Sequence, residues 1–199
     1  MFLENPVNRK SQFGSIEVIC GSMFSGKTEE LIRRIKRAEL ASKKVKVFKP
    51  SSDKRAKKNI VISHDSNKVK AVCVNSAKEI IPLVYNCDIV AIDECQFFGS
   101  EIIPVTNYLA NNGLRVIAAG LDMDFEGNPF GPIPNLMAIA EDVLKVRGIC
   151  SRTGGLSLYS FRKAKQKGLV VLGKKDVYEP LSREAFFKAM KNSELKKDT

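Results

Sequence analysis

Short apolar runs alternate with amphipathic stretches along the first two thirds of the chain. Runs rich in Val and Ile predict strands, and apolar residues three and four positions apart predict helices. The alternation in residues 15–20 predicts a half-buried strand, whereas later runs are almost wholly apolar. Apolar strands separated by helices are typical of a parallel sheet covered on both faces. We expect strands at 15–20, 45–48, 60–62, 71–74, 88–94 and 114–121, and helices at 29–38, 77–86, 101–112 and 133–143.

The pattern changes after about Leu144. Shorter apolar runs joined by Gly and Lys predict a small β appendage, and Ser182 can cap a last helix. These strands are expected at 146–150, 156–162 and 169–172, and the helix from 183 to about 193. The predicted organisation is a polar arm at 1–14, an α/β domain at 15–144, the appendage with its helix at 145–193, and a frayed tail at 194–199.

The segment between the first strand and the first helix fits the phosphate-binding pattern G-x-x-x-x-G-K-[ST]. In such a loop the glycines let successive backbone N–H groups point at phosphate oxygens, and the following helix N-terminus favours negative charge. We expect Lys27 to reach the β- and γ-phosphates of ATP and Thr28 to bind Mg²⁺. The predicted ATP-binding loop consists of Gly21, Ser22, Met23, Phe24, Ser25, Gly26, Lys27 and Thr28.

Two carboxylates, Asp93 and Glu94, end the strand expected at 88–94. Because the carboxyl ends of parallel strands meet at one edge of the sheet, Asp93 should lie beside the glycine-rich loop and hold Mg²⁺. Glu94 then faces the γ-phosphate as a candidate base. The pattern alone also allows a pair of acidic residues that only cap a strand end. Asp53 and Arg55 belong either to the same cleft or to a solvated loop.

Composition and charge narrow the function classes. The chain has 199 residues, 44% hydrophobic and 28% charged, which is ordinary for a soluble globular protein. The net charge is +11, and the basic residues concentrate in three segments, 43–58, 162–175 and 188–197. This distribution indicates a solvated surface that attracts polyphosphate substrates rather than a nucleic-acid interface. The five cysteines are scattered, so no disulfide framework is expected. Without an export signal or a long apolar segment, we expect a cytoplasmic protein without membrane contact.

Six motifs follow one another along the chain, namely GSMFSGKT at 21–28, KPSSDKR at 49–55, SHDSN at 63–67, DECQFF at 93–98, AAGLDMDFEGNPFG at 118–131 and LGKKDVYEPLSR at 172–183. In their order and spacing, they resemble those of the type II thymidine kinase family, the cytosolic form shared by bacteria and vertebrates. The resemblance implies a P-loop, recombinase-like α/β fold with a mostly parallel sheet and helices on both faces. It also implies a small C-terminal β lasso domain that closes over the nucleoside. The resemblance runs from about Gly14 to Phe187.

The resemblance also implies roles for individual residues. Glu94 would accept the proton of the 5′-hydroxyl of thymidine, while Lys27 and Arg55 would balance charge on the transferring phosphoryl group. Asp93 and Thr28 would hold Mg²⁺. Gln96 and Asp53 would arrange the metal, phosphate or sugar end, and Cys95 lies in the same ATP-binding segment. Apart from the resemblance, core packing is the simpler interpretation of the aromatic residues. The implied nucleoside-binding residues are Met23, Phe24, Asp53, Phe97, Leu121, Phe125, Phe130, Ser160, Leu169, Val171, Gly173 and Tyr178.

The partners implied by the resemblance are ATP, thymidine, thymidine triphosphate as an inhibitor, and other copies of the chain in a homotetramer. Because a methyl group discriminates by only about 1–3 kcal/mol, deoxyuridine should be a poorer or comparable substrate. The alternative class is a nucleic-acid-stimulated P-loop ATPase, which the sheet type and the positive charge allow. A kinase of another nucleoside or nucleotide is a third possibility.

The sequence departs from the family at its zinc site. Many members hold a structural zinc with two ligand pairs of the type C-x-x-C and C-x-x-[CH]. Here the pairs read Cys150-Ser151-Arg152-Thr153 and Ser182-Arg183-Glu184-Ala185, so only one thiol remains and no structural zinc is expected. The expected substitutes are the Ser182 cap and packing by Leu181, Phe186 and Phe187.

Two polar loops, 63–67 and 163–168, are expected to be mobile without ligand. The one histidine, His64, lies in the first of them and is interpreted as a loop residue rather than a metal ligand.

Overall fold

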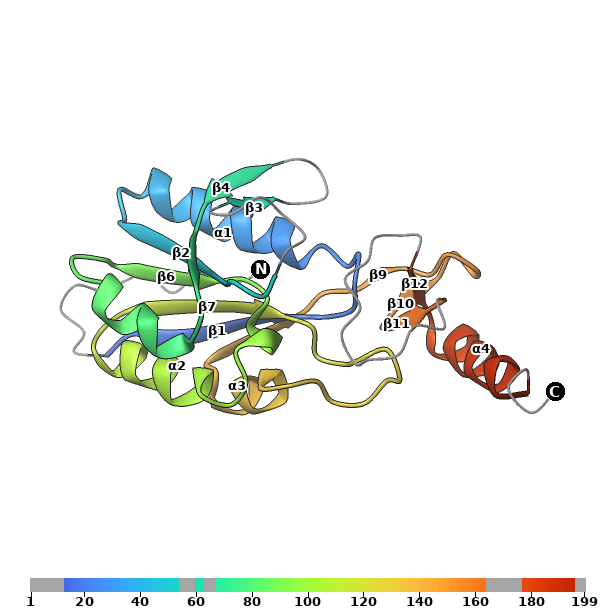
Figure 1. The fold of residues 1–199 in the computed structure, drawn as a ribbon. Helices are drawn as coiled ribbons and strands as arrows, with labels where there is room; N and C mark the ends of the chain where they lie inside the picture. Colours follow the sequence, from blue (N-terminus) through green and yellow to red (C-terminus); the bar gives the residue numbers. More distant parts are fainter. Residues whose placement is uncertain (1–12, 54–59, 63–66, 164–176, 196–199) are drawn as a thin grey trace.

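The computed structural model describes residues 13–53, 60–62, 67–163 and 177–195. A six-stranded sheet of order β5-β2-β6-β7-β1-β8 forms its centre, and every pair of neighbours runs parallel (Figure 1). The predicted α/β fold class is therefore confirmed. The strands are β1 (Ser15–Cys20), β2 (Val45–Pro50), β5 (Val72–Val74), β6 (Ile89–Ile92), β7 (Arg115–Gly120) and β8 (Asp142–Lys145).

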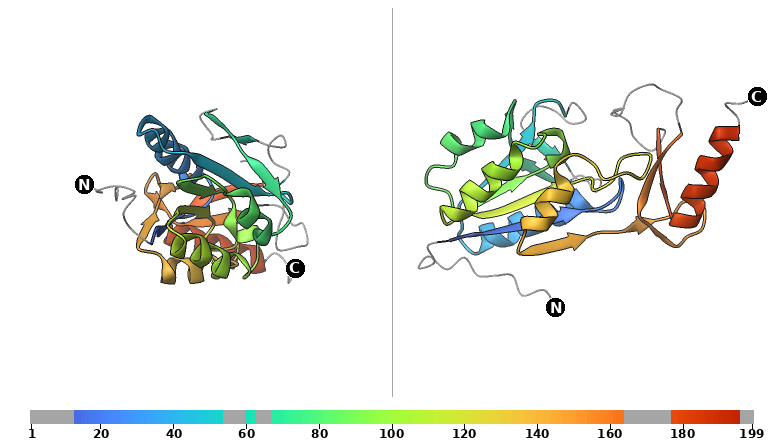
Figure 2. Two further views of the ribbon diagram at one scale, coloured as in Figure 1. Left: turned by 90° about the vertical axis from the view of Figure 1, so that its left-hand side faces the viewer. Right: turned by 90° about the horizontal axis from the view of Figure 1, so that it is seen from below.

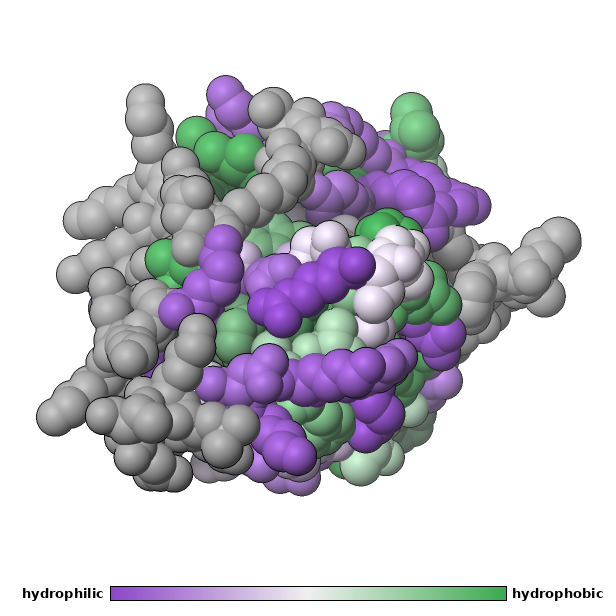
Figure 3. Space-filling model, turned by 90° about the vertical axis from the view of Figure 1, so that its right-hand side faces the viewer, coloured by the Kyte–Doolittle hydropathy of each residue, from purple (hydrophilic) through white to green (hydrophobic). Residues whose placement is uncertain are grey.

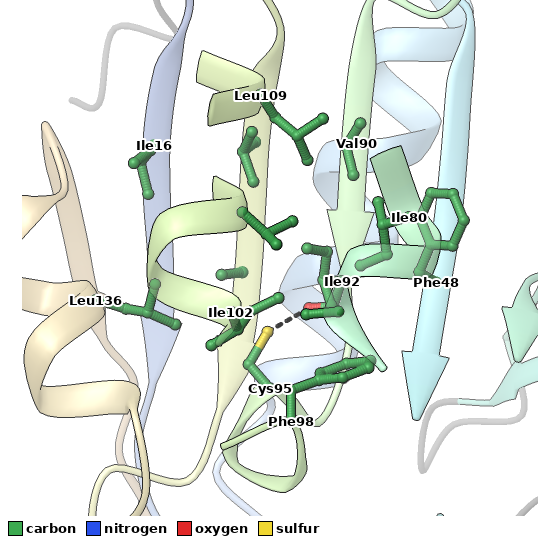
Figure 4. Packing of buried hydrophobic residues seen from close by; sticks show 14 of the residues in the cluster. Ile16, Phe48, Ile80, Val90, Ile92, Cys95, Phe98, Ile102, Leu109 and Leu136 are labelled. Atoms are coloured by element: carbon green, nitrogen blue, oxygen red, sulfur yellow. Dashed lines mark hydrogen bonds between the residues drawn. The ribbon is translucent and has the colours of Figure 1, made fainter. Parts of the chain in front are cut away.

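Helices cover both faces of this sheet, as the views in Figures 1 and 2 show. One face carries α1, whose apolar stripe packs on the strands. The opposite face carries two α-helices and two 3₁₀ helices, the shorter being η2 (Cys95–Phe97), and Figure 4 shows apolar side chains packed on this face. The bounds are α1 (Lys27–Leu40), η1 (Ala77–Leu83), α2 (Ile102–Asn111) and α3 (Ile133–Ile139).

The central strands are buried on both faces. Along β6, successive side chains alternate between faces, so Ala91 packs with the α1 cluster while Val90 and Ile92 pack with the helices opposite. Strand β1 is buried in the same way from Ile16 onward. The prediction of a half-buried strand at 15–20 is wrong, because β7 and β8 flank β1 and helices cover both of its faces.

Several predicted elements end differently in the structure. The helix expected at 133–143 ends at Ile139, because β8 continues as an extra parallel strand beside β1. The helix expected at 77–86 is the shorter 3₁₀ helix η1, with Pro82 inside it, where a proline cannot donate a helical hydrogen bond. The hairpin of β3 (Ile60–Ile62) and β4 (Lys68–Lys70) contains a charged strand that the pattern did not predict.

Two small antiparallel sheets and a last helix follow β8, beyond one end of the central sheet (Figure 1). The strand predicted at 156–162 is divided between two of these sheets, and the one predicted at 169–172 lies outside the described residues. Ser182 caps the last helix as predicted, since its Oγ accepts a hydrogen bond from the Ala185 N–H at 3.4 Å. The elements are β9 (Gly148–Ile149), β10 (Leu156–Ser157), β11 (Tyr159–Arg162), β12 (Tyr178–Leu181) and α4 (Arg183–Leu195).

A separate apolar cluster joins α4 to these strands. Leu181 and Phe186 are fully buried, and the Phe186 ring stacks on Tyr159 with ring centroids 4.5 Å apart. Phe187 is 52% exposed and makes edge-to-face contacts with Tyr159 and Phe186. The predicted packing is confirmed for Leu181 and Phe186, whereas Phe187 packs with only part of its ring because the adjacent helix position turns toward the surface.

A buried ion cluster lies at the start of β1. The Glu17 carboxylate accepts hydrogen bonds from Arg34 of α1 and from Arg115 of β7, the latter with N–O distances of 2.5 and 3.0 Å. Arg34 also donates to Glu30 at 2.8 Å and to Asp142 at 3.0 Å. The side chains of Glu17, Arg34 and Arg115 are each less than a tenth exposed, so the charges are shielded from water and depend on one another.

Candidate active site

The glycine-rich loop joins the carboxyl end of β1 to α1. Gly21 and Gly26 have φ angles of 143° and 91°, which other residues rarely adopt. The Lys27 ammonium donates to the Ser22 carbonyl at 2.8 Å, and the Ser25 hydroxyl donates to the same oxygen at 2.7 Å. These bonds close the loop on itself beside the helix N-terminus, where backbone N–H groups favour an anion.

Asp93 and Thr28 meet beside this loop. The Thr28 Oγ1 lies 3.5 Å from the Asp93 Oδ2, although the two residues are 65 positions apart in the sequence. Asp93 follows β6 directly and is buried, and its other oxygen accepts the Glu94 N–H at 3.0 Å. A hydroxyl and a carboxylate oxygen at this spacing are ligands that Mg²⁺ prefers, so these residues fit the predicted metal.

Glu94 has left-handed backbone angles, with φ 54° and ψ 41°. This conformation is uncommon for a residue other than glycine, and such residues recur at functional sites. Its buried carboxylate accepts a hydrogen bond from the Gln96 side-chain amide. The Gln96 Oε1 in turn accepts the Leu121 N–H at 3.0 Å. The carboxylate is therefore held in one orientation by a side chain that is itself fixed to the end of β7.

The aromatic candidates lie around the loop that follows β7. Phe97 and Phe130 are in edge-to-face contact with ring centroids 6.4 Å apart, and the Arg162 guanidinium lies 3.4 Å from the ring centre of Phe125. All three rings are half-buried, in contrast to the neighbouring Phe98, which belongs to the main core. They are thus available to a ligand, as the nucleoside-pocket hypothesis requires.

The strands after β8 touch the glycine-rich loop directly. The Met23 N–H donates to the Ser160 Oγ of β11 at 2.9 Å. The backbone of Gly148 in β9 runs so close to the loop that a Cβ atom there would lie 3.1 Å from the Phe24 carbonyl oxygen. Tyr178 pairs with Arg162 across the β11–β12 hairpin and is buried.

Figure 3 views the molecule from the α4 end, where hydrophilic and hydrophobic side chains are interspersed over the coloured surface.

Four predicted site residues lie outside the described residues, namely Arg55, Leu169, Val171 and Gly173. The same is true of His64, which was interpreted as a loop residue, and of most of the loops 63–67 and 163–168. Asp53 is described, and its carboxylate lies 3.9 Å from the Lys49 ammonium. Sequence reasoning did not assign Lys49, which is 2% exposed at the end of β2. A charged residue that ends an apolar strand is the signal that identified Asp93, and the same signal could have found Lys49.

The cysteines provide no nucleophile at this site. All five are free thiols, as the scattered pattern predicted. Burial raises the pKa of Cys20 to about 11 and that of Cys95 well above its usual value, so both stay neutral. Cys150 occupies a position where many family members have a zinc ligand. Burial opposes its ionisation, but hydrogen bonds from the Thr153 side chain and nearby backbone N–H groups lower its pKa to about 6.

The described part of the chain contains neither a cluster of metal-binding side chains nor a helix that could span a membrane. Within residues 13–53, 60–62, 67–163 and 177–195, no group of three or more His, Cys, Asp or Glu side chains is arranged to hold a metal ion. No helix among these residues is long and apolar enough to span a membrane.

A parallel α/β sheet with a phosphate-binding loop at one strand end and paired acidic residues at another defines a P-loop nucleotide-binding protein. Comparison with known proteins narrows this class. Residues 14–186 match the family model described as thymidine kinase. The chain belongs to the thymidine kinase family.

Similar proteins share most of their length with this chain. A thymidine kinase of Bacteroides fragilis is 50% identical over 196 residues, covering 98% of each protein. A thymidine kinase of Porphyromonas gingivalis is 49% identical over 175 residues, covering 88% of this chain and 86% of the relative. A thymidine kinase of a Rhodothermus species is 50% identical over 173 residues, covering 87% of this chain and 81% of the relative.

Proposed function

We propose that this protein is a thymidine kinase that transfers the γ-phosphoryl group of ATP to the 5′-hydroxyl of thymidine. The observation that carries the proposal is the Glu94 carboxylate, which Gln96 orients and which follows directly on Asp93, the residue that meets Thr28 of the P-loop. A carboxylate fixed in this way can accept the hydroxyl proton as the new P–O bond forms. Membership of the thymidine kinase family indicates thymidine as the acceptor, and the P-loop indicates ATP as the phosphate donor.

Phosphoryl transfer depends mainly on positioning and on charge stabilisation. In this proposal Lys27 and the backbone N–H groups of residues 21–28 orient the phosphates of ATP, and Arg55 adds a further positive charge. Asp93 and Thr28 would hold Mg²⁺, which on binding offsets the negative charge of the phosphate oxygens. Cys95 and Gln96 complete the segment beside the phosphates, with Gln96 orienting the base.

The nucleoside is proposed to bind between the loop after β7 and the strands that follow β8. We propose that residues 15–144 form the kinase domain and 145–193 the lasso domain, between an N-terminal arm and a short tail. The Met23–Ser160 hydrogen bond supports a pocket that both parts share. The proposed pocket residues are Met23, Phe24, Asp53, Phe97, Leu121, Phe125, Phe130, Ser160, Leu169, Val171, Gly173 and Tyr178.

A substrate panel tests the function. With ATP and Mg²⁺, we expect rapid formation of thymidine monophosphate, and slower or comparable phosphorylation of deoxyuridine, because one methyl contact discriminates by about 1–3 kcal/mol. Other nucleosides and single-stranded DNA are the comparisons. ATP consumption stimulated by single-stranded DNA but not by thymidine would favour the ATPase alternative, and turnover of a different nucleoside alone would identify another kinase.

We also propose that the enzyme contains no structural zinc. The family's four ligand positions hold Cys150, Thr153, Ser182 and Ala185 here, of which only Cys150 offers a thiol. Hydrogen bonds among these residues and their backbone connect them directly. We expect a strong zinc chelator to leave both the melting temperature and the activity unchanged. Elemental analysis of protein purified without added metal measures this directly, and about one zinc per chain would contradict the proposal.

The location, the oligomeric state, the inhibitor and the partners are proposed from the resemblance to the family. We propose a cytoplasmic homotetramer, inhibited by thymidine triphosphate, that works without nucleic acid or membrane partners. Sedimentation of the purified protein and inhibition assays with thymidine triphosphate test the first two properties.

A further inference from the structure

Lys49 is a buried cation without a hydrogen-bond partner in the part of the chain that the structure describes. Its side chain is 2% exposed, and its ammonium makes no hydrogen bond among the described residues. The Asp53 carboxylate lies 3.9 Å from the ammonium. Removing an ammonium from water is costly unless hydrogen bonds and opposite charges compensate, so packing alone gives no reason for a lysine here.

The strand register locates this cation beside the proposed metal-binding carboxylate. Phe48 of β2 pairs with Ile92 of β6, and the Asp93 N–H donates to the Phe48 carbonyl at 2.9 Å. Lys49 and Asp93 are therefore the next residues of two neighbouring strands. Val47 and Ala91 pack in the cluster beneath α1, so by alternation Lys49 and Asp93 face the α1 side as well. The Asp93–Thr28 contact agrees with this direction.

The neighbourhood of Lys49 is acidic. Asp53, Asp93 and Glu94 follow the carboxyl ends of two adjacent strands, and the side chains of the last two are buried. Three carboxylates at one sheet edge repel one another, and the interaction between them is stronger where water is excluded. A cation on the same side of the sheet reduces that repulsion and attracts the nearer carboxylate.

We propose that Lys49 is a positioning residue for phosphoryl transfer, whose ammonium holds the Asp53 carboxylate at the edge of the P-loop site. The proposal rests on the proposed thymidine kinase function. Lys49 acts through Asp53 and offsets part of the acidic charge near Asp93. The buried ammonium lowers the free energy of unfolding, but it holds the Asp53 carboxylate in position before ATP and thymidine bind.

The test compares Lys49→Met with Lys49→Arg. Methionine has a similar length and no charge, so Lys49→Met should melt at or a few degrees above the wild-type temperature. Its kcat should fall by about 10–100-fold, while the KM for thymidine stays within about threefold, because the change misplaces one group by a small distance. Lys49→Arg keeps the charge and should recover part of the lost kcat. Lys46→Met on the same strand is the matched control, since Lys46 is exposed and donates to the Leu83 carbonyl.

A double-mutant cycle with Asp53→Asn tests whether Lys49 acts through Asp53. If it does, Lys49→Met combined with Asp53→Asn should lose no more kcat than the more damaging single variant. The proposal would be overturned if the kcat losses of the two single variants multiplied in the double variant. A wild-type kcat in Lys49→Met, or a fall in its melting temperature that parallels its loss of activity, would overturn it as well. The wild-type enzyme in the same assay separates the two hypotheses, because failure to phosphorylate thymidine there would refute the proposed function itself.

Discussion

Replacing Glu94 by Gln is expected to lower turnover by roughly 10²–10⁴-fold while the protein still folds and binds ATP and thymidine. Glutamine has the size of glutamate and keeps an oxygen that can accept the hydrogen bond from Gln96. It cannot accept the proton of the 5′-hydroxyl. The loss should therefore appear in kcat, with dissociation constants for both substrates within about threefold of wild type.

Steady-state kinetics and calorimetric titration of both substrates measure these two quantities. Glu39→Gln is the matched control, because Glu39 is exposed near the end of α1 that points away from the P-loop, and its kcat should equal that of the wild type. A wild-type kcat in Glu94→Gln would remove Glu94 from the role of base and leave its left-handed backbone conformation without a catalytic explanation.

Replacing Glu17 by Gln is expected to destabilise the protein by about 3–5 kcal/mol, because it removes the carboxylate that compensates the buried charge of Arg115. The Glu17 carboxylate accepts hydrogen bonds from both Arg34 and Arg115, and all three side chains are less than a tenth exposed. Glutamine retains the shape but no charge. Asp142 and Glu30 still contact Arg34, whereas Arg115 loses the carboxylate to which it donates two hydrogen bonds.

Chemical denaturation followed by circular dichroism measures this change in the free energy of unfolding. Glu184→Gln is the control, since Glu184 pairs with Lys188 on the exposed face of α4 and its loss should not be measurable. If the two variants were equally stable, the buried cluster would contribute no more than a surface pair. Activity per folded molecule should stay close to wild type in both, because neither residue contacts the P-loop site.

The amino-acid sequence determined the parts of this protein that depend on neighbouring residues. The P-loop follows from eight consecutive residues, and β1 has the predicted bounds because its Val- and Ile-rich run is bordered by polar residues and glycine. Asp93 was predicted beside Thr28 because parallel strands share one functional edge, and the structure confirms that contact. Ser182 caps α4 as predicted, since a cap is a contact within one turn.

The tertiary structure alone decided the features that join distant parts of the chain. Strand β8 became an edge of the sheet, where its pairing with β1 outweighs the helical pattern of the preceding residues. The burial of Glu17 depends on Arg115, 98 positions away, and the Met23–Ser160 contact spans 137 positions. The register of β2 against β6 is what brings Lys49 close to the acidic residues that follow these strands. Local periodicity carries no information about such pairings, because their energy comes from desolvation and charge in the folded core.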